Sequence, residues 1–281
     1  MDTSGYFDQN TPDLGPDLRR ETVLTLENLG IPVESRHHEA APSQHEIELR
    51  HTDALTMADT VMTYKLVVKE IAMSHGYFAS FMPKPSSAIN GNGMHTHMSL
   101  FRGDENVFYS HNEKHHLSET ARQFCAGLLK HAREITLVTN QWVNSFKRLV
   151  PSYEAPIYVT WAEVNRSDLI RIPSFKPGRE SSRRIEYRAP DPACNPYLAF
   201  SVMLAAGMVG IEVEYGEFSS PDRKLLASIA DEFKLLHCGG SDYHASGNPG
   251  EAPLGSAAST LETVAKLESM TKHKHVSSTQ D

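Results

Sequence analysis

A block near the front of the chain carries residue types that bind divalent cations. Glu39 follows two histidines, and Glu46 follows a third. Carboxylate oxygens suit hard cations such as Mg²⁺ and Mn²⁺, and imidazole nitrogen also suits Mn²⁺. A single glutamate is usually a solvated surface residue. For this block taken alone, a metal site and an ordinary polar surface therefore remain alternatives.

A glycine-rich turn then leads into a strand that carries two histidines. Asn90-Gly91 is a strong turn signal, and glycine lets the backbone approach a ligand closely. His95, His97 and Ser99 follow at alternate positions, which share one face of a strand. A simple turn before a strand is the alternative, but the histidine pattern favours a binding surface.

Arginines recur in apolar segments of the second half of the chain. They are Arg148, Arg166, Arg171, Arg184 and Arg188. Guanidinium groups bind carboxylate and phosphate through paired hydrogen bonds. Internal pairing with glutamate could explain any one of them, but it does not easily explain all five. Surplus positive charge facing metal-binding carboxylates is what phosphoryl transfer from a nucleotide requires.

The elements that position these residues alternate along the chain. Helical signals cover residues 17–28, 52–75, 118–138 and 197–209, with Ser118 as a cap. Strand-like runs cover residues 45–50, 77–82, 95–101, 157–161, 169–172 and 184–188. This alternation predicts an α+β fold with a curved, antiparallel-leaning sheet flanked by helices. In the last run both arginines and Glu186 share a face, which indicates the wall of a polar cavity.

Composition limits the classes of protein that fit. The 281 residues suffice for one large domain or two smaller ones, and 40% hydrophobic with 22% charged residues is typical of a soluble globular protein. A net charge of −8 argues against a nucleic-acid partner, and no apolar run predicts a membrane span. The acidic opening is unlike a signal peptide. Cys125, Cys194 and Cys238 are sparse, which predicts reduced thiols and a cytoplasmic protein.

Several blocks resemble, in the same order, the signatures of glutamine synthetases. The run from Lys84 to Ser99 is similar to the family's ATP-region signature, although Ser86 stands where an apolar residue is usual. NSFKRLVPSYEAP, NRS with IRIP, and RRIEYRAPDPACNPYLAF resemble the later blocks. Residues 5–8 and HHEAAPSQHEIELR complete a resemblance over about residues 5–206. It implies a glutamine synthetase-type catalytic domain at residues 1–207.

The resemblance also implies roles for particular side chains. Those implied to hold metal are Glu39, Glu46, His95 and Glu186. Those implied to bind the amino-acid substrate are Asn90, Gly91, Arg148 and Arg188. Those implied to lie at ATP, with some near the ammonium, are Tyr6, Glu34, His97, Ser99, Arg166 and Arg171. The implied catalytic residues are Glu154, Arg166 and Arg148, with Glu154 on a mobile flap.

The implied reaction has two steps. ATP phosphorylates the γ-carboxylate of glutamate with the help of Mg²⁺ or Mn²⁺, and ammonia then displaces phosphate from γ-glutamyl phosphate. The flap keeps water from this intermediate. Family members also carry a Glu-x-Glu strand and an amino-terminal β domain, so we expect the chain to be incomplete at its N-terminus and its activity to be impaired. The resemblance implies a homo-oligomer.

Three alternative functions remain open. The first two are a γ-glutamyl ligase that uses another amine and a non-catalytic nucleotide-binding relative. The third comes from residues 208–257, which resemble the last part of PHP-family metal-dependent phosphoesterases. There Asp242 and His244 match late metal ligands, although the early His-x-His ligands of that family have no counterpart. We expect a PHP-like segment at residues 208–270 and a polar tail at residues 271–281.

Overall fold

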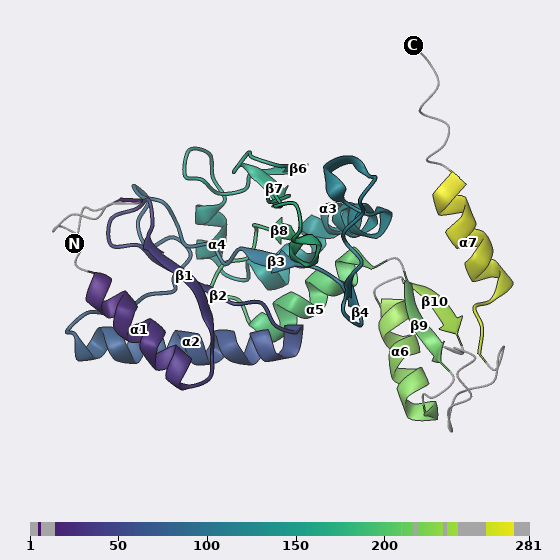
Figure 1. The fold of residues 1–281 in the computed structure, drawn as a ribbon, viewed down its shortest axis with the longest axis horizontal. Coiled ribbons are helices and arrows are strands. Elements are labelled where there is room, and N and C mark those ends of the chain that lie inside the picture. The colour runs from purple at the N-terminus through teal and green to yellow at the C-terminus, as the bar shows by residue number, and fades with distance from the viewer. Residues whose placement is uncertain are drawn as a thin grey trace, which may run out of the picture. The chain divides into compact units, whose positions relative to one another are not determined.

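The computed structural model describes residues 5–6, 15–208, 210–215, 219–232, 235–240 and 257–272 (Figure 1). The chain forms two compact units, Met1–Leu204 and Ala205–Asp281. The first unit contains every position to which the glutamine synthetase resemblance assigns a role. Within the described residues, no helix is both long enough and apolar enough to cross a membrane.

The first unit begins with two packed helices and a hairpin. Helix α1 (Pro16–Asn28) starts at a proline, which suits the first turn, and α2 (Ala54–Ser74) starts after Asp53. The Asp53 carboxylate accepts the backbone N–H groups of Leu55 and Thr56, so it caps α2. Leu26 of α1 is fully buried against Val67 and Ile71 of α2. This apolar contact anchors the hairpin that follows α1, because Val33 and Leu49 pack on the same cluster.

The hairpin consists of β1 (Val33–His38) and β2 (His45–Leu49), which are antiparallel. His37 lies opposite Glu46, and His38 lies opposite His45. Residues directly opposite each other on antiparallel strands point to the same face. The hairpin register therefore brings an imidazole and a carboxylate from two distant sequence positions together.

A four-stranded sheet forms the middle of the first unit. Its order is β3 (Thr96–Met98), β8 (Ile185–Tyr187), β7 (Asp168–Arg171) and β6 (Tyr158–Ala162). Strand β8 is antiparallel to both of its neighbours, whereas β6 and β7 are parallel, so the sheet is mixed. His97, Glu186 and Arg171 occupy one row across three strands. At the edge, β6 exposes Tyr158, Val159 and Trp161.

Further helices and turns surround this sheet. Helix α3 (Glu119–Thr139) is capped by Ser118 and buries Phe124 and Leu128, and the short α4 (Val143–Arg148) follows it. A small hairpin, β4 (Phe101–Arg102) and β5 (Glu105–Asn106), precedes the 3₁₀ turn η1 (Lys114–His116). A second 3₁₀ turn, η2 (Glu180–Ser182), precedes β8, and α5 (Pro196–Gly207) follows it.

The second unit contains a parallel strand pair. Strand β9 (Gly210–Tyr215) is followed by α6 (Ser220–Glu232) and β10 (Leu236–Gly240), and β9 and β10 are parallel. Helix α7 (Leu261–Lys272) contacts β10. The order strand, helix, parallel strand is a βαβ unit.

The four helices predicted from sequence are present, with ends shifted by one or two residues. The strand predicted at residues 77–82 is wrong, because this segment is irregular. Gly76, at φ +76°, ends α2, and the Tyr77 N–H still bonds back to the Ala72 carbonyl. The run at residues 95–101 is shorter than predicted, since only Thr96–Met98 pairs with β8. Strand β1 and helices α4, α6 and α7 were not predicted, and α7 continues into the expected polar tail.

Candidate active site

Glu186 is the centre of the polar face of the sheet. Glu186 is almost completely buried, with only 1% of its surface exposed to solvent. One carboxylate oxygen accepts a 2.6 Å hydrogen bond from Arg188 Nη1 and lies 3.4 Å from His95 Nδ1, and the other accepts from Arg171 Nε. Two guanidinium groups thus share one buried carboxylate through charge-assisted hydrogen bonds. Three of the residues predicted for this site, drawn from three separate segments, thus meet at Glu186.

The two histidines on β3 and just before it are held in the neutral form. Loss of hydration, followed by the charges of Arg188 and Arg148, lowers the pKa of His95 well below its ordinary value. Loss of hydration lowers the pKa of His97 to about 4, although Glu186 opposes this shift. A neutral imidazole has the lone pair that a metal ion requires. The Arg184 Nε donates to His97 Nδ1 at 3.0 Å, so His97 is turned toward Arg184.

The β1–β2 hairpin carries the second cluster of potential ligands. His37 Nε2 lies 3.1 Å from Glu39 Oε1 and 3.7 Å from Glu46 Oε2. One donor atom from each of these three residues lies within 4.8 Å of the other two. Sequence reasoning included Glu39 and Glu46, and the structure adds His37.

The two carboxyl groups of this cluster, Glu39 and Glu46, differ in pKa in a way that suits a cation site. Burial and the neighbouring Glu39 carboxylate raise the pKa of Glu46 to about 8. Burial also disfavours charge on Glu39, but hydrogen bonds from the Ala40 N–H, Glu46 and His37 keep its pKa below the ordinary value. Two carboxyl groups that share one proton would both ionise beside a divalent cation. The residues present therefore fit the Mg²⁺ or Mn²⁺ that the resemblance implies.

Asn90, Glu154 of the predicted flap and Arg166 form a hydrogen-bonded chain. Asn90 Nδ2 donates to Glu154 Oε2 at 3.3 Å, and Arg166 Nη1 donates to Glu154 Oε1 at 3.2 Å. Glu154 has φ +55° and Ser152 has φ +74°, a backbone region that is strained for both residue types. Tyr153 lies between them, with Lys84 Nζ 3.5 Å from the centre of its ring. Backbone strain at Ser152 and Glu154 thus lies next to the hydrogen bonds that Glu154 accepts from Asn90 and Arg166.

Arg148 is buried beneath the Asn90-Gly91 turn. It is 2% exposed and donates to the main-chain carbonyls of Ala189 (2.7 Å), Pro190 (3.3 Å) and Arg188 (3.0 Å). Burial lowers the pKa of its guanidinium to about 10, so it keeps its charge at neutral pH. In this structure the guanidinium of Arg148 fixes the strand end that carries Arg188.

Two glycines of the same turn leave no room for larger residues. A Cβ on Gly91 would lie 2.4 Å from the Pro83 carbonyl oxygen. A Cβ on Gly93 would lie 2.6 Å from Arg148 Nη2 and 2.7 Å from His95 Nε2. Close backbone approach is the physical reason for glycine at both positions.

Gln44 connects the two halves of the site. Its Nε2 donates to the Gly91 carbonyl and to Asn92 Oδ1, both at 2.9 Å. Gln44 lies in the turn of the β1–β2 hairpin, so one amide joins the Glu39–Glu46 cluster to the Asn90-Gly91 turn. Sequence reasoning missed it because a glutamine in a turn has no distinctive pattern.

The remaining predicted residues are more scattered. The Tyr6 ring lies edge-on to the His37 ring, with centroids 4.9 Å apart, whereas Glu34 is exposed at the start of β1. Ser99 is half-buried after β3. Asp242 and His244 lie outside the described residues.

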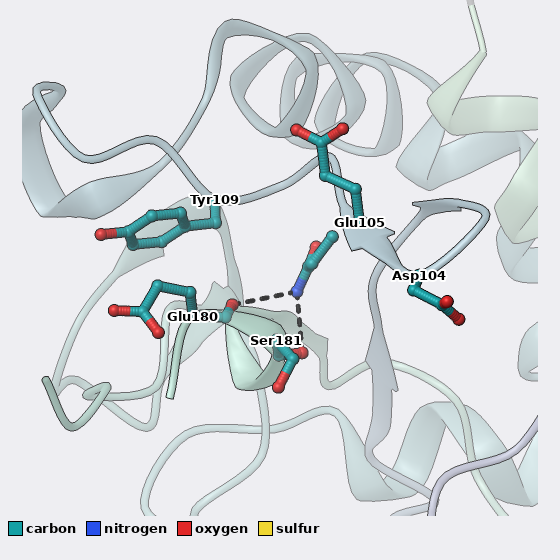
Figure 2. Close-up of a pocket in the computed structure, with 6 residues that line it drawn as sticks. Asp104, Glu105, Tyr109, Glu180 and Ser181 are labelled. Atoms are coloured by element: carbon teal, nitrogen blue, oxygen red, sulfur yellow. Dashed lines mark hydrogen bonds between the residues drawn. The ribbon is translucent and has the colours of Figure 1, made fainter. Parts of the chain in front are cut away.

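A separate cavity of about 210 Å³ lies between the β4–β5 hairpin and η2 (Figure 2). Half of its six lining residues are acidic; the six are Asp104, Glu105, Asn106, Tyr109, Glu180 and Ser181. Asn106 Nδ2 donates to the Ser181 carbonyl at 2.9 Å, which holds the two walls together. None of the residues predicted for the active site lines this cavity.

Neutral imidazoles, carboxylates and arginines on a mixed sheet make up a set of side chains that can hold a divalent cation together with anionic groups. The chain belongs to the glutamine synthetase family, since residues 1–229 match the family described as "Glutamine synthetase, catalytic domain". This match extends to residue 229 and so includes the first part of residues 208–257, for which a PHP-family resemblance is expected.

Relatives named glutamine synthetase are similar over three quarters of the chain. The protein from Mycolicibacterium smegmatis is 55% identical over 214 residues, which are 76% of this chain and 48% of that protein. The one from Methanosarcina mazei is 54% identical over 211 residues, which are 75% of this chain and 46% of that protein. The chain therefore spans about half the length of the curated relatives it matches.

Solved structures agree with this assignment. A cryo-EM structure of Plasmodium falciparum glutamine synthetase has a TM-score of 0.70 and 36% identity, and the match covers 73% of this chain and 40% of that one. A GmaS/ADP complex has a TM-score of 0.66 and 36% identity, with 73% and 48% covered.

Proposed function

We propose that this chain carries the catalytic part of an ATP-dependent ligase that joins ammonia to the γ-carboxylate of glutamate through γ-glutamyl phosphate. The observation that supports this most is the convergence of Arg171, Arg188 and His95 on Glu186. In that arrangement His95 and Glu186 would form a metal-ligand pair beside two guanidinium groups suited to anions. GmaS, which is 36% identical to this chain over the matched region, forms a complex with ADP.

The divalent cations would be held by two sets of side chains. Glu39 and Glu46 would hold one, and His95 with Glu186 would hold the other. A bound cation would supply charge neutralisation for the transferred phosphoryl group. The chain itself would position the phosphate. Arg171 and Arg188 already donate hydrogen bonds to the Glu186 carboxylate, and the same guanidinium groups would also bind phosphate oxygens.

Residues of the turn and the flap would bind the amino acid and exclude water. Asn90 and the Gly91 backbone would hold the amino end of glutamate, and Arg148 and Arg188 its carboxylate. Arg166 and Arg171 would contact phosphate, with Tyr6, Glu34, His97 and Ser99 lining the nucleotide or ammonium region. Glu154 would close over the intermediate and accept the ammonium proton. The Glu154 bonds to Asn90 and Arg166 support this role, because they connect the flap to both predicted ligand regions.

A hydroxylamine assay tests this function directly. With ATP, glutamate and Mn²⁺ or Mg²⁺, the chain should form γ-glutamyl hydroxamate, and Glu186→Gln should lose that product. Glu119→Gln, at an exposed ion pair with Arg122, is the matched control and should keep it. Metal-dependent ATP binding without hydroxamate or glutamine would instead favour a non-catalytic nucleotide-binding protein. Product from methylamine but not from ammonia would favour a ligase for another amine.

We infer a second possible role only for the end of the chain. The parallel pair β9 and β10, joined by α6, places the Gly239-Gly240 end of β10 just before Asp242 and His244. Ligands commonly bind beyond the carboxyl ends of parallel strands, so this order supports a PHP-like segment at residues 208–270. Phosphoesterase activity that Asp242→Ala abolishes would support it, and unchanged activity would reject it.

We also propose that the ligase acts as a homo-oligomer in the cytoplasm.

A further inference from the structure

We propose that the His37 imidazole is a direct ligand of the cation held by Glu39 and Glu46, through its Nε2 atom. This inference rests on the proposed function only in taking that cation to be Mn²⁺ or Mg²⁺. The sequence predicted two carboxylate ligands for this cation, Glu39 and Glu46, and His37 would be the third ligand.

The distances fit a shared ion. Neighbouring ligands of an octahedral ion with bonds of about 2.1 Å are separated by about 3.0 Å. His37 Nε2 lies 3.1 Å from Glu39 Oε1, which matches that spacing, and 3.7 Å from Glu46 Oε2. The three donors already lie within 4.8 Å of one another, so small side-chain movements would complete the set.

The backbone imposes this convergence. His37 lies directly opposite Glu46 in the β1–β2 register, and Glu39 is two residues beyond His37. The Glu39 N–H bonds to the Gln44 carbonyl, which continues the hairpin past the paired strands. Opposite residues and alternate residues share a face, so all three side chains leave the hairpin on one side. A one-residue shift of register would turn His37 away from Glu46.

Other histidine–carboxylate contacts in the described parts of the chain lack this geometry. His75 Nε2 lies 2.7 Å from Glu21, and His115 Nδ1 lies 2.7 Å from Glu163, each with one carboxylate. In the segments that the structure describes, only His37, Glu39 and Glu46 form a group of three potential ligands. His37 is also one-fifth exposed, so its ring remains open to an ion from solvent.

Two roles for His37 predict different spectroscopic results. If His37 only orients the carboxylates through hydrogen bonds, a bound Mn²⁺ would have oxygen ligands alone at this site. If Nε2 is a ligand, its proton must reside on Nδ1 and Mn²⁺ must show magnetic coupling to nitrogen. Pulsed electron paramagnetic resonance of Mn²⁺ bound to the full chain measures that coupling.

The experiment uses His95→Gln as its background, which removes the other imidazole assigned to a metal site. We expect nitrogen coupling in this variant and its loss when His37→Gln is added. His75→Gln is the matched control and should leave the coupling intact. We also expect Mn²⁺ affinity to fall roughly tenfold to hundredfold with His37→Gln. His37→Asp, which offers an oxygen donor, should restore affinity without restoring nitrogen coupling.

Nitrogen coupling that persists in the His95→Gln/His37→Gln double variant, or Mn²⁺ bound to the His95→Gln background without such coupling, would overturn the assignment. Circular dichroism and the melting temperature of each variant identify any loss of affinity that comes from misfolding. Loss of Mn²⁺ binding in the folded background variant would also count against an independent site at the hairpin. A wild-type chain that makes no hydroxamate, together with His37-dependent nitrogen coupling in the His95→Gln background, would reject the proposed function and leave the His37 assignment standing.

Discussion

Glu186 on β8 lies directly opposite Arg171 on β7, and the Arg171 guanidinium bonds to its carboxylate. Arg188 bonds to the other oxygen from two residues further along β8. Removal of the carboxylate charge would leave two guanidinium groups, one of them buried, without their shared anion. Stability and the site's chemistry therefore depend on the same side chain.

We expect Glu186→Gln to lower the free energy of unfolding by about 3 kcal/mol, because it leaves buried positive charge unpaired. Urea unfolding at pH 7 measures this loss. Glu119→Gln removes an exposed pair with Arg122 and should change stability by no more than about 1 kcal/mol. Equal effects of the two substitutions would mean that the Glu186 cluster is not a coupled, buried unit.

Alanine at Gly91 and at Gly93 should have unequal effects. At Gly91 the added Cβ meets a backbone oxygen, which can move only if the turn moves with it. At Gly93 it meets the ends of two side chains: the His95 imidazole is partly exposed and can shift, whereas the Arg148 guanidinium is held by main-chain carbonyls. We expect Gly91→Ala to weaken glutamate binding more than tenfold and Gly93→Ala to do so less. Calorimetric titration with glutamate and Mn²⁺ checks the order, and a larger effect at Gly93 would contradict it.

Ser152→Gly should stabilise the chain. Ser152 has φ +74°, where a residue with a Cβ is strained by about 1–3 kcal/mol. Glycine removes that strain but costs about 0.5–1 kcal/mol of backbone entropy. We expect a net gain of about 0.5–1 kcal/mol in urea unfolding. Ser87→Gly, at an exposed loop position without positive φ, should give no gain.

Cation binding at the hairpin should release a proton. Because the pKa of Glu46 is about 8, its carboxyl group is mostly protonated at pH 7, and a bound cation would require it to ionise. We expect about one proton per Mn²⁺ at pH 7 and far less at pH 9. Titration calorimetry in two buffers with different ionisation enthalpies counts the protons, and Glu46→Gln should abolish the release.

The same carboxyl group should make stability depend on pH when no metal is present. Its folded pKa is raised from the ordinary 4.5 to about 8, so its favourable contribution is full below pH 4.5 and is lost as pH rises toward 8. His97, whose pKa is lowered to about 4, acts in the opposite direction below pH 6.5. The wild type minus Glu46→Gln difference in urea midpoint isolates the Glu46 contribution, which should decline from pH 5 to pH 8.

Local sequence signals predicted most of the helices and the facing of single strands. Ser118 before α3 and Pro16 at the start of α1 mark helix starts by mechanisms that act within one turn. Alternation in residues 184–188 likewise predicted that Glu186 and Arg188 share a face, which their hydrogen bond confirms. These features depend only on neighbours in the chain.

Pairing between distant segments was beyond such reasoning. Nothing local specifies that His37 lies opposite Glu46, or that Gln44 reaches Gly91, because register depends on how α1 and α2 bury the hairpin. The strand prediction for residues 77–82 was wrong for a related reason. Its aromatic residues have strand propensity, but the described structure gives them no partner strand.

The amide of Gln44 has a consequence for how two ligands would influence each other. It joins the hairpin turn to the Gly91 carbonyl, so a ligand that orders one side shifts the conformational populations of the other. Thermodynamic reciprocity then requires the cation and the amino acid to change each other's dissociation constants by the same factor. Replacement of Gln44 by alanine would make the two equilibria independent.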